Sequence, residues 1–158
     1  MLEPVAGQGT TADRGLLGFA LMADGTKQEL LYVDGGASTN GQVGKLRMQG
    51  NQVFRHAVVN ISEAVLAAAN DAGIGMDEVD WFIPHQANLR ILQGVARRLG
   101  IDESKVITTL DKHANTSAAS IPLALYEGVR DGRVRPGQLL LLEAMGGGLT
   151  WGACVIRL

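Results

Sequence analysis

Helix-like and strand-like segments alternate along this chain from residue 50 onward, and this order constrains the fold more than any other feature. Between Gly50 and Ala72, apolar residues recur at three- and four-residue spacing, which predicts an amphipathic helix that ends at Gly73. The segments that follow predict a strand, a helix, a strand, a helix and two strands, at Val79–Pro84, Leu89–Leu99, Lys105–Leu110, Ser117–Val129, Gln138–Glu143 and Leu149–Arg157. Such alternation is typical of an α/β sheet with helices on both faces. Because only a short glycine turn separates the last two strands, we expect them to run antiparallel.

The N-terminal part of the chain is less regular. Leu16–Met22 predicts a strand and Leu30–Val33 a shorter one, whereas residues 35–48 are expected to be irregular and exposed. Residues 1–14 mix glycine, threonine, proline and charges without periodicity, which predicts a loop-like start. The sequence therefore indicates one domain over residues 15–158, long enough to bury a hydrophobic core.

Composition narrows the class of protein. Hydrophobic residues make up 46% and charged residues 19%, which argues against a disordered chain. A net charge of −2 gives no general reason to expect nucleic acid or an anionic membrane as partner. No apolar run approaches the ~20 residues that span a bilayer, and no signal-peptide pattern is seen, so we expect a cytoplasmic protein. The single cysteine, Cys154, lies in an alternating apolar run and is interpreted as a small buried side chain rather than a nucleophile.

Three groups of residues follow predicted strands, at the edge where open α/β sheets bind their ligands. His85 lies between a strand and a helix, Asn115 belongs to the run His113–Ser120, and Gly146–Gly148 follows a third strand. Each has a simpler structural interpretation. A histidine at such a position is more often structural, Asn115 and Thr116 could cap the next helix, and the glycines could form only a hairpin.

Taken together, these groups suit the chemistry of thioesters. A histidine and an asparagine side by side could both donate hydrogen bonds to one thioester carbonyl and stabilise the enolate formed when a β-carboxylate leaves as carbon dioxide. An N–H of the glycine loop could help to hold a tetrahedral oxyanion. The three histidines and one cysteine lack zinc-type spacing, so no metal is expected. The glycine run also lacks the lysine of a phosphate-binding loop.

Three motifs occur here in a fixed order: Pro84-His85-Gln86-Ala87-Asn88, His113-x-Asn115-Thr116-Ser117-Ala118-Ala119-Ser120 and Gly146-Gly147-Gly148-x-Thr150-Trp151-Gly152. In this combination the chain resembles β-ketoacyl-acyl-carrier-protein synthase III, a family of the thiolase superfamily. The similarity extends from about Gly15 to Leu158 and corresponds to the C-terminal half of that family's proteins. The resemblance implies a three-layer α/β/α thiolase-like half with a mixed five-stranded sheet whose last strand is antiparallel.

The resemblance also implies an activity, an acyl transfer that initiates fatty-acid synthesis. The family joins an acyl-CoA, often acetyl-CoA, to malonyl-acyl carrier protein in a decarboxylative Claisen condensation. A cysteine takes up the acyl group, and a histidine and an asparagine promote decarboxylation. The two substrates carry phosphopantetheine, and no further cofactor is implied. The catalytic positions correspond to His85 and Asn115.

Other positions carry over residue by residue. Gly147 corresponds to a glycine whose backbone shares the oxyanion site, and the substrate tunnel corresponds to Phe54, Ala87, Asn88 and Met145. The surface that docks the acidic carrier protein corresponds to Arg90, Arg97 and Arg98, although these arginines could also be an ordinary solvated helix face. Two positions depart from the family, since Ala114 stands where glycine is common and Met145 where phenylalanine is common.

The family's nucleophilic cysteine belongs to the N-terminal half, and Cys154 does not correspond to it. We therefore expect these 158 residues to expose an apolar face, to be inactive alone, and to need an N-terminal half as partner. The resemblance implies a homodimer for the full-length enzyme. Two alternatives stay open, namely a related ketosynthase of a polyketide or quinolone pathway and a non-catalytic half that serves assembly.

Overall fold

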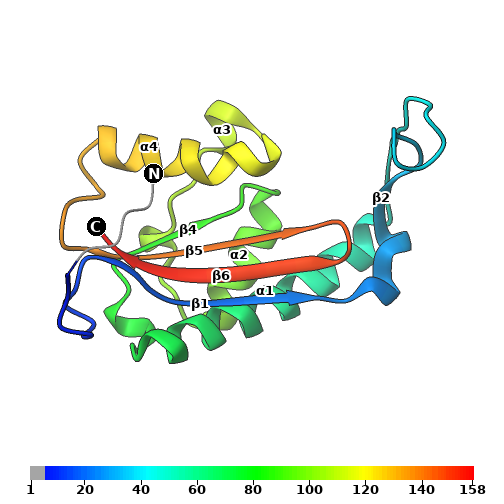
Figure 1. Ribbon diagram of the computed structural model, residues 1–158. Helices are drawn as coiled ribbons and strands as arrows, with labels where there is room; N and C mark the ends of the chain where they lie inside the picture. The colour runs from blue at the N-terminus through cyan, green and yellow to red at the C-terminus, as the bar shows by residue number, and fades with distance from the viewer. Residues whose placement is uncertain (1–5) are drawn as a thin grey trace.

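The computed structural model describes residues 6–158, and their centre is a four-stranded mixed sheet between two helical layers (Figure 1). The strands are β1 (Gly15–Ala23), β4 (Trp81–Pro84), β5 (Leu139–Gly146) and β6 (Thr150–Arg157), in the order β1-β6-β5-β4. β4 pairs with β5 in parallel, whereas β6 is antiparallel to both β1 and β5. The predicted α/β class and the antiparallel last strand are confirmed.

One face of the sheet is covered by α1 (Gly50–Ala72), with α2 (Leu89–Leu99) beside it. The apolar stripe of α1 consists largely of small residues, so the helix lies close to the strands. At Gly18 in β1, a Cβ atom would come within 2.4 Å of the Ala72 backbone nitrogen, which shows why glycine is needed at this contact. The helix ends at Gly73 with φ of 69°, as the sequence predicts.

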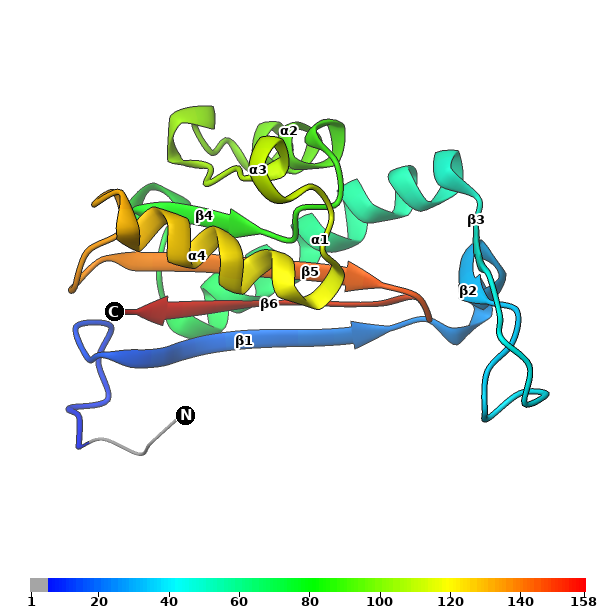
Figure 2. The same ribbon diagram turned by 90° about the horizontal axis from the view of Figure 1, so that it is seen from above.

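The opposite face is covered only in part. α3 (Leu110–His113) and α4 (Ser120–Arg130) lie on the other side of the sheet from α1 (Figures 1 and 2). A second apolar cluster packs α4 against β4 and β5. The side chains of β1 that point to this side remain uncovered, with exposed fractions of 52% for Leu16, 54% for Phe19 and 78% for Leu21. We call these three residues the open sheet face, and they confirm the expected exposed apolar surface.

The strand expected over Lys105–Leu110 is wrong, and the sheet has four strands rather than five. Only one bridge forms there, where Val106 lies parallel to Phe82, and the Ile107 N–H donates to the Phe82 carbonyl at 2.9 Å. Ile107 in this segment is nevertheless fully buried. After this bridge, the backbone of the segment forms hydrogen bonds with a side chain and not with a neighbouring strand.

That side chain is Gln86, which is 0% exposed. Its Nε2 donates to the carbonyls of Pro84 at 2.8 Å and Ile107 at 3.2 Å, and its Oε1 accepts the Thr109 N–H at 2.9 Å. A single amide therefore satisfies backbone groups of two segments and joins the end of β4 to the chain that leads into α3.

Replacing Gln86 by alanine is expected to lower the free energy of unfolding by about 2 kcal/mol, because it leaves the Ile107 carbonyl and the Thr109 N–H buried without partners. Urea unfolding followed by circular dichroism measures this loss. Gln52→Ala is the matched control, since Gln52 is exposed and only reaches Gln49, and it should change stability by less than about 0.5 kcal/mol. Equal effects of the two variants would contradict the role given to Gln86.

The segment before α1 forms a separate small sheet of β2 (Leu31–Val33) and β3 (Leu46–Met48). β2 was predicted, but β3 lies within residues 35–48, which were expected to be irregular, so that expectation is wrong at its C-terminal end. This arm projects from the end of the main sheet in both views (Figures 1 and 2). Residues 6–158 also contain four short 3-10 helices, at Gly25–Leu30, Met76–Glu78, Glu103–Lys105 and Ser117–Ala119.

The predicted loop-like start over residues 1–14 lies partly outside the described residues. Within residues 6–14 there are only turns and bends, and β1 begins at Gly15. None of the described helices has the length and apolar character needed to cross a membrane.

Candidate active site

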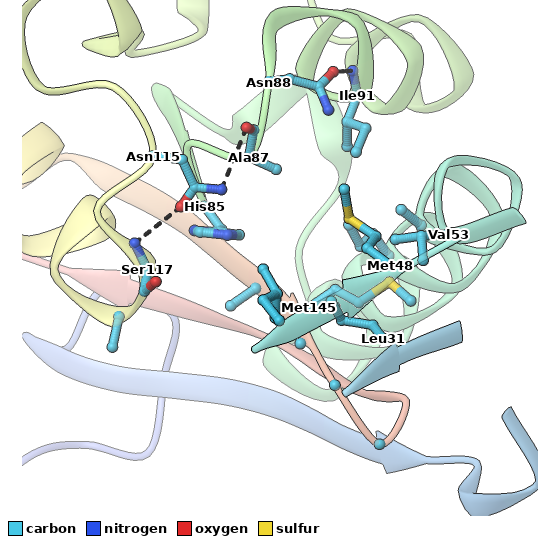
Figure 3. Close-up of a pocket in the computed structure, with 18 of the residues that line it drawn as sticks. Leu31, Met48, Val53, His85, Ala87, Asn88, Ile91, Asn115, Ser117 and Met145 are labelled. Carbon is cyan, nitrogen blue, oxygen red and sulfur yellow. Dashed lines mark hydrogen bonds between the residues drawn. The ribbon is translucent and has the colours of Figure 1, made fainter. Parts of the chain in front are cut away.

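A half-open cavity of about 980 Å³ lies at the carboxyl ends of β4 and β5 (Figure 3). Its lining comes from the β4–α2 turn, the loop before α4, the glycine hairpin between β5 and β6, the N-terminal half of α1 and the β2–β3 arm. Six of the residues predicted from the sequence line this cavity: His85, Ala87, Asn88, Asn115, Met145 and Gly147. Three segments that are distant in sequence therefore meet in one site, at the sheet edge from which ligand binding was predicted.

His85 directly follows β4 and is half-buried. Its N–H donates to the Glu143 carbonyl at 2.8 Å, which continues the parallel ladder by one residue and fixes the backbone. Its ring nitrogen Nδ1 lies 2.6 Å from the Ser120 hydroxyl oxygen. Burial lowers the pKa of His85 below its usual value of 6.5, so the imidazole is uncharged at neutral pH.

Asn115 lies in the loop between α3 and α4, and both ends of its amide are oriented by neighbours. Its Oδ1 accepts the Ser117 N–H at 2.9 Å, and its Nδ2 donates to the Ala87 carbonyl over a long 3.4 Å. The second Nδ2 hydrogen therefore stays available for a ligand in the cavity. Because Oδ1 is already engaged, Asn115 can serve there as a donor (Figure 3).

The backbone is strained on both sides of Asn115. Ala114 has φ of 52° and ψ of −154°, and Ser117 has φ of 53°, a region that favours glycine or asparagine. Strain of this kind persists where the surrounding structure holds it in place, and it gathers at functional sites. The expected helix start at Ser117 is also shifted, because a 3-10 turn occupies Ser117–Ala119 and α4 begins at Ser120.

Ala114→Gly is expected to stabilise the chain by about 1 kcal/mol, because glycine adopts this backbone conformation without strain. Thermal unfolding should show a higher midpoint for the variant. Ala119→Gly is the control, since Ala119 has an ordinary helical conformation with φ of −76°, and its replacement should be neutral or destabilising. A lower midpoint for Ala114→Gly would show that the loop is not strained at this residue.

The glycine hairpin closes one side of the cavity. At Gly147 a Cβ atom would lie 2.7 Å from the Leu31 carbonyl oxygen, so only glycine lets the hairpin approach β2 this closely. Met145 packs against the core beneath α1 and also lines the cavity. The hairpin thus brings backbone groups of Gly147 to the same space as His85 and Asn115.

The remaining positions expected in the tunnel separate into two kinds. Ala87 and Asn88 line the cavity, and Asn88 also caps α2 by accepting the Ile91 N–H at 3.1 Å. Phe54 does not line this cavity, because α1 turns Val53 toward it and Phe54 toward α2. The Arg90 guanidinium lies 5.5 Å from the centre of the Phe54 ring.

The three arginines expected at a docking surface are all on α2 and exposed. Within residues 6–158, Arg90, Arg97 and Arg98 form no ion pair. Arg97 and Arg98 also occupy the last turn of α2, where positive charge suits the helix dipole.

Sequence reasoning missed two buried polar groups of the site besides Gln86. Ser120 contacts the His85 ring, and Glu143 lies under the cavity with its Oε2 unpartnered among residues 6–158. Burial raises the pKa of Glu143 to about 8, so its carboxyl group is largely protonated at neutral pH. The available signal for Glu143 was a charged side chain directly after the four leucines of the predicted strand Gln138–Glu143. Ser120 ends the second sequence motif, but nothing local in the sequence indicates that it contacts His85.

Cys154 lies on β6 and is half-buried, and burial raises the pKa of its thiol. A raised thiol pKa disfavours the thiolate, which agrees with its interpretation as a non-nucleophilic residue. Within the described part of the chain, no three side chains of His, Cys, Asp or Glu gather to hold a metal ion.

Known proteins share both the sequence and the fold. Residues 69–158 match the family model described as 3-oxoacyl-[acyl-carrier-protein (ACP)] synthase III C terminal. Over all 158 residues the chain is 75% identical to a β-ketoacyl-[acyl-carrier-protein] synthase III of Caulobacter vibrioides and 58% identical to one of Rhodospirillum rubrum, covering 49% of each.

Solved structures of proteins with related names also share the fold of this chain. The 3-oxoacyl-[acyl-carrier-protein] synthase III of Aquifex aeolicus superimposes with a TM-score of 0.85 at 42% identity, over 92% of this chain and 45% of that one. A priming β-ketosynthase from the R1128 polyketide pathway gives 0.83 at 33% identity, over 91% of this chain and 45% of the other. The chain spans about half the length of the curated relatives it matches. This chain thus belongs to the 3-oxoacyl-[acyl-carrier-protein] synthase III family, in the part that forms the C-terminal, thiolase-like half.

Proposed function

We propose that this chain supplies the carbonyl-activating half of a β-ketoacyl-[acyl-carrier-protein] synthase III. The observation that carries the proposal is the cavity in which His85 and Asn115 lie together, with the Asn115 amide oriented as a donor. Two uncharged hydrogen-bond donors that line one cavity favour a carbonyl oxygen that becomes negative during reaction.

In the proposed reaction, a cysteine of a complementary half first attacks the thioester of an acyl-CoA such as acetyl-CoA, and the CoA thiolate leaves. Malonyl-acyl carrier protein then enters the cavity with its thioester oxygen against His85 Nε2 and Asn115 Nδ2. The bond to the carboxylate breaks, carbon dioxide leaves, and the electron pair becomes an enolate held by the two donors. The enolate carbon attacks the acyl-cysteine carbonyl, and the cysteine thiolate leaves as the new carbon–carbon bond forms.

Both substrates would carry phosphopantetheine, and the reaction needs no further cofactor. We assign the tunnel to Ala87, Asn88 and Met145, with the Gly147 backbone at the oxyanion position. Phe54 would act at the outer end of this path, near Arg90. The carrier protein is acidic, so the unpaired charge on α2 supports its docking at Arg90, Arg97 and Arg98.

The complementary half would cover the open sheet face. Three large apolar side chains in a row on β1 are the kind of surface that a protein partner buries. The assembled enzyme is proposed to be a cytoplasmic homodimer. A polyketide-type ketosynthase is the second candidate, supported by the likeness to the R1128 priming enzyme.

The test is complementation with the N-terminal half of the Caulobacter vibrioides relative, which is 75% identical over the present chain. The two halves are co-expressed and supplied with acetyl-CoA and malonyl-acyl carrier protein, and carbon dioxide and the ketoacyl product are measured. Product formation that requires both halves is the expected result. A stable complex that releases no carbon dioxide would point instead to a non-catalytic assembly role.

A further inference from the structure

Ser120 is the first residue of α4 and is 1% exposed. Its hydroxyl oxygen lies between two groups of the β4–α2 turn, 2.6 Å from His85 Nδ1 and 3.2 Å from the backbone nitrogen of Gln86. The start of α4 is therefore tied directly to the histidine that lines the cavity. The loop carrying Asn115 leads into this same helix through the 3-10 turn Ser117–Ala119.

The direction of these hydrogen bonds follows from counting protons. The Gln86 N–H can only donate, so Ser120 Oγ accepts there. Within residues 6–158, His85 Nδ1 is the one acceptor found for the Ser120 hydroxyl proton. If Nδ1 carried the proton, the hydroxyl would accept two bonds and its own hydrogen would be buried without a partner, which is unfavourable.

We infer that Ser120 is a positioning residue that donates its hydroxyl proton to His85 Nδ1 and thereby holds the His85 proton on Nε2. Nε2 is the ring nitrogen on the side away from Ser120, and it makes no hydrogen bond within the described residues. It is therefore free to donate to a ligand in the cavity. The inference rests on the proposed function for its catalytic meaning, although the tautomer itself is a property of this chain alone.

This arrangement has a chemical consequence. With Nδ1 occupied as an acceptor, uncharged His85 can give a hydrogen bond through Nε2 but has no free lone pair to act as a base. The side chain therefore matches Asn115, whose Oδ1 is likewise occupied and whose Nδ2 donates. Each donor of the site is oriented by a neighbouring residue: His85 by Ser120 at the start of α4, and Asn115 by Ser117 in the turn before it.

The direct test is long-range ¹H–¹⁵N NMR of the ¹⁵N-labelled chain at pH 8, where His85 is uncharged. We expect a protonated, pyrrole-like Nε2 and an imine-like Nδ1 shifted by an accepted hydrogen bond. A pyrrole-like Nδ1 on His85 would overturn the inference. This readout does not depend on any partner or substrate, so it fails independently of the proposed function.

Two variants extend the test. In Ser120→Ala the Nδ1 resonance should move toward that of an unbonded imine nitrogen, and in the assembled enzyme decarboxylation should slow about tenfold, as expected for loss of a partner that orients a functional histidine. Ser62→Ala is the matched control, because Ser62 is also 1% exposed but donates to the Val58 carbonyl inside α1. It should leave the His85 resonances unchanged. An unshifted Nδ1 in Ser120→Ala would show that the serine does not donate to it.

Discussion

His85→Ala in the complemented enzyme is expected to slow release of carbon dioxide from malonyl-acyl carrier protein by about 10²–10³-fold. The variant removes a donor that the proposed enolate needs, while the cysteine of the complementary half can still take up the acyl group. Asn115→Ala should have an effect of similar size for the same reason. The two steps are measured separately: decarboxylation by the release of carbon dioxide, and acylation of the cysteine by mass spectrometry of the protein.

His56→Ala is the matched control for this experiment. His56 lies on α1, is half-buried and does not line the cavity, so its loss should leave both steps close to those of the parent protein. Loss of acylation together with decarboxylation in His85→Ala would count against the role given to this residue, because it would indicate a general collapse of the site.

Glu143→Gln is expected to remove a pH dependence of stability amounting to a few kcal/mol. The folded chain raises the pKa of Glu143 from 4.5 to about 8 by burial, so between these values the folded state holds a proton that the unfolded state has lost. The contribution of this group to the free energy of unfolding is therefore complete below pH 4.5 and declines as the pH rises toward 8. The variant should match the parent near pH 5 and exceed it at pH 8.5.

Urea unfolding at several pH values measures this difference in stability. Because the variant is compared with the parent protein, the pH dependence that other titrating groups contribute cancels. One of these is His85, whose lowered pKa acts in the opposite direction, since its contribution is lost as the pH falls below 6.5. Glu127→Gln is the control of opposite sign. Hydrogen bonding with Lys112 lowers the pKa of Glu127, so its replacement should destabilise the chain at neutral pH. A pH dependence in Glu143→Gln equal to that of the parent would contradict a buried, protonated Glu143.

The predictable part of the fold came from periodicity. The spacing of apolar residues in Gly50–Ala72 identified α1 with its end at Gly73, and the glycine turn predicted that β6 is antiparallel to β5. Lys105–Leu110 was misread because an apolar run shows burial but not pairing, and the partner of its backbone is the side chain of Gln86. β3 was missed because three residues are too short a segment to show a period.

The candidate site was predictable where motifs mark the ends of strands. His85 and Gly147 were chosen from such positions. Asn115 was chosen because it follows a predicted strand that does not form, yet the structure brings all three residues to one cavity. Phe54 was assigned by correspondence alone, and the rotation of α1 that turns Val53 to the cavity instead is a tertiary property. The contact of Ser120 with His85 depends on how α4 packs against β4, which no local pattern records.

Whether this chain is one half of a shared active site can be tested by its mass in solution, measured by light scattering with and without the co-expressed N-terminal half of the Caulobacter vibrioides relative. We expect the 16.7 kDa chain to self-associate through the open sheet face when it is alone. With the complementary half, we expect a stable complex that contains the two polypeptides in equal number. A monodisperse 16.7 kDa monomer that ignores the complementary half would contradict the claim that this chain is one half of a shared active site.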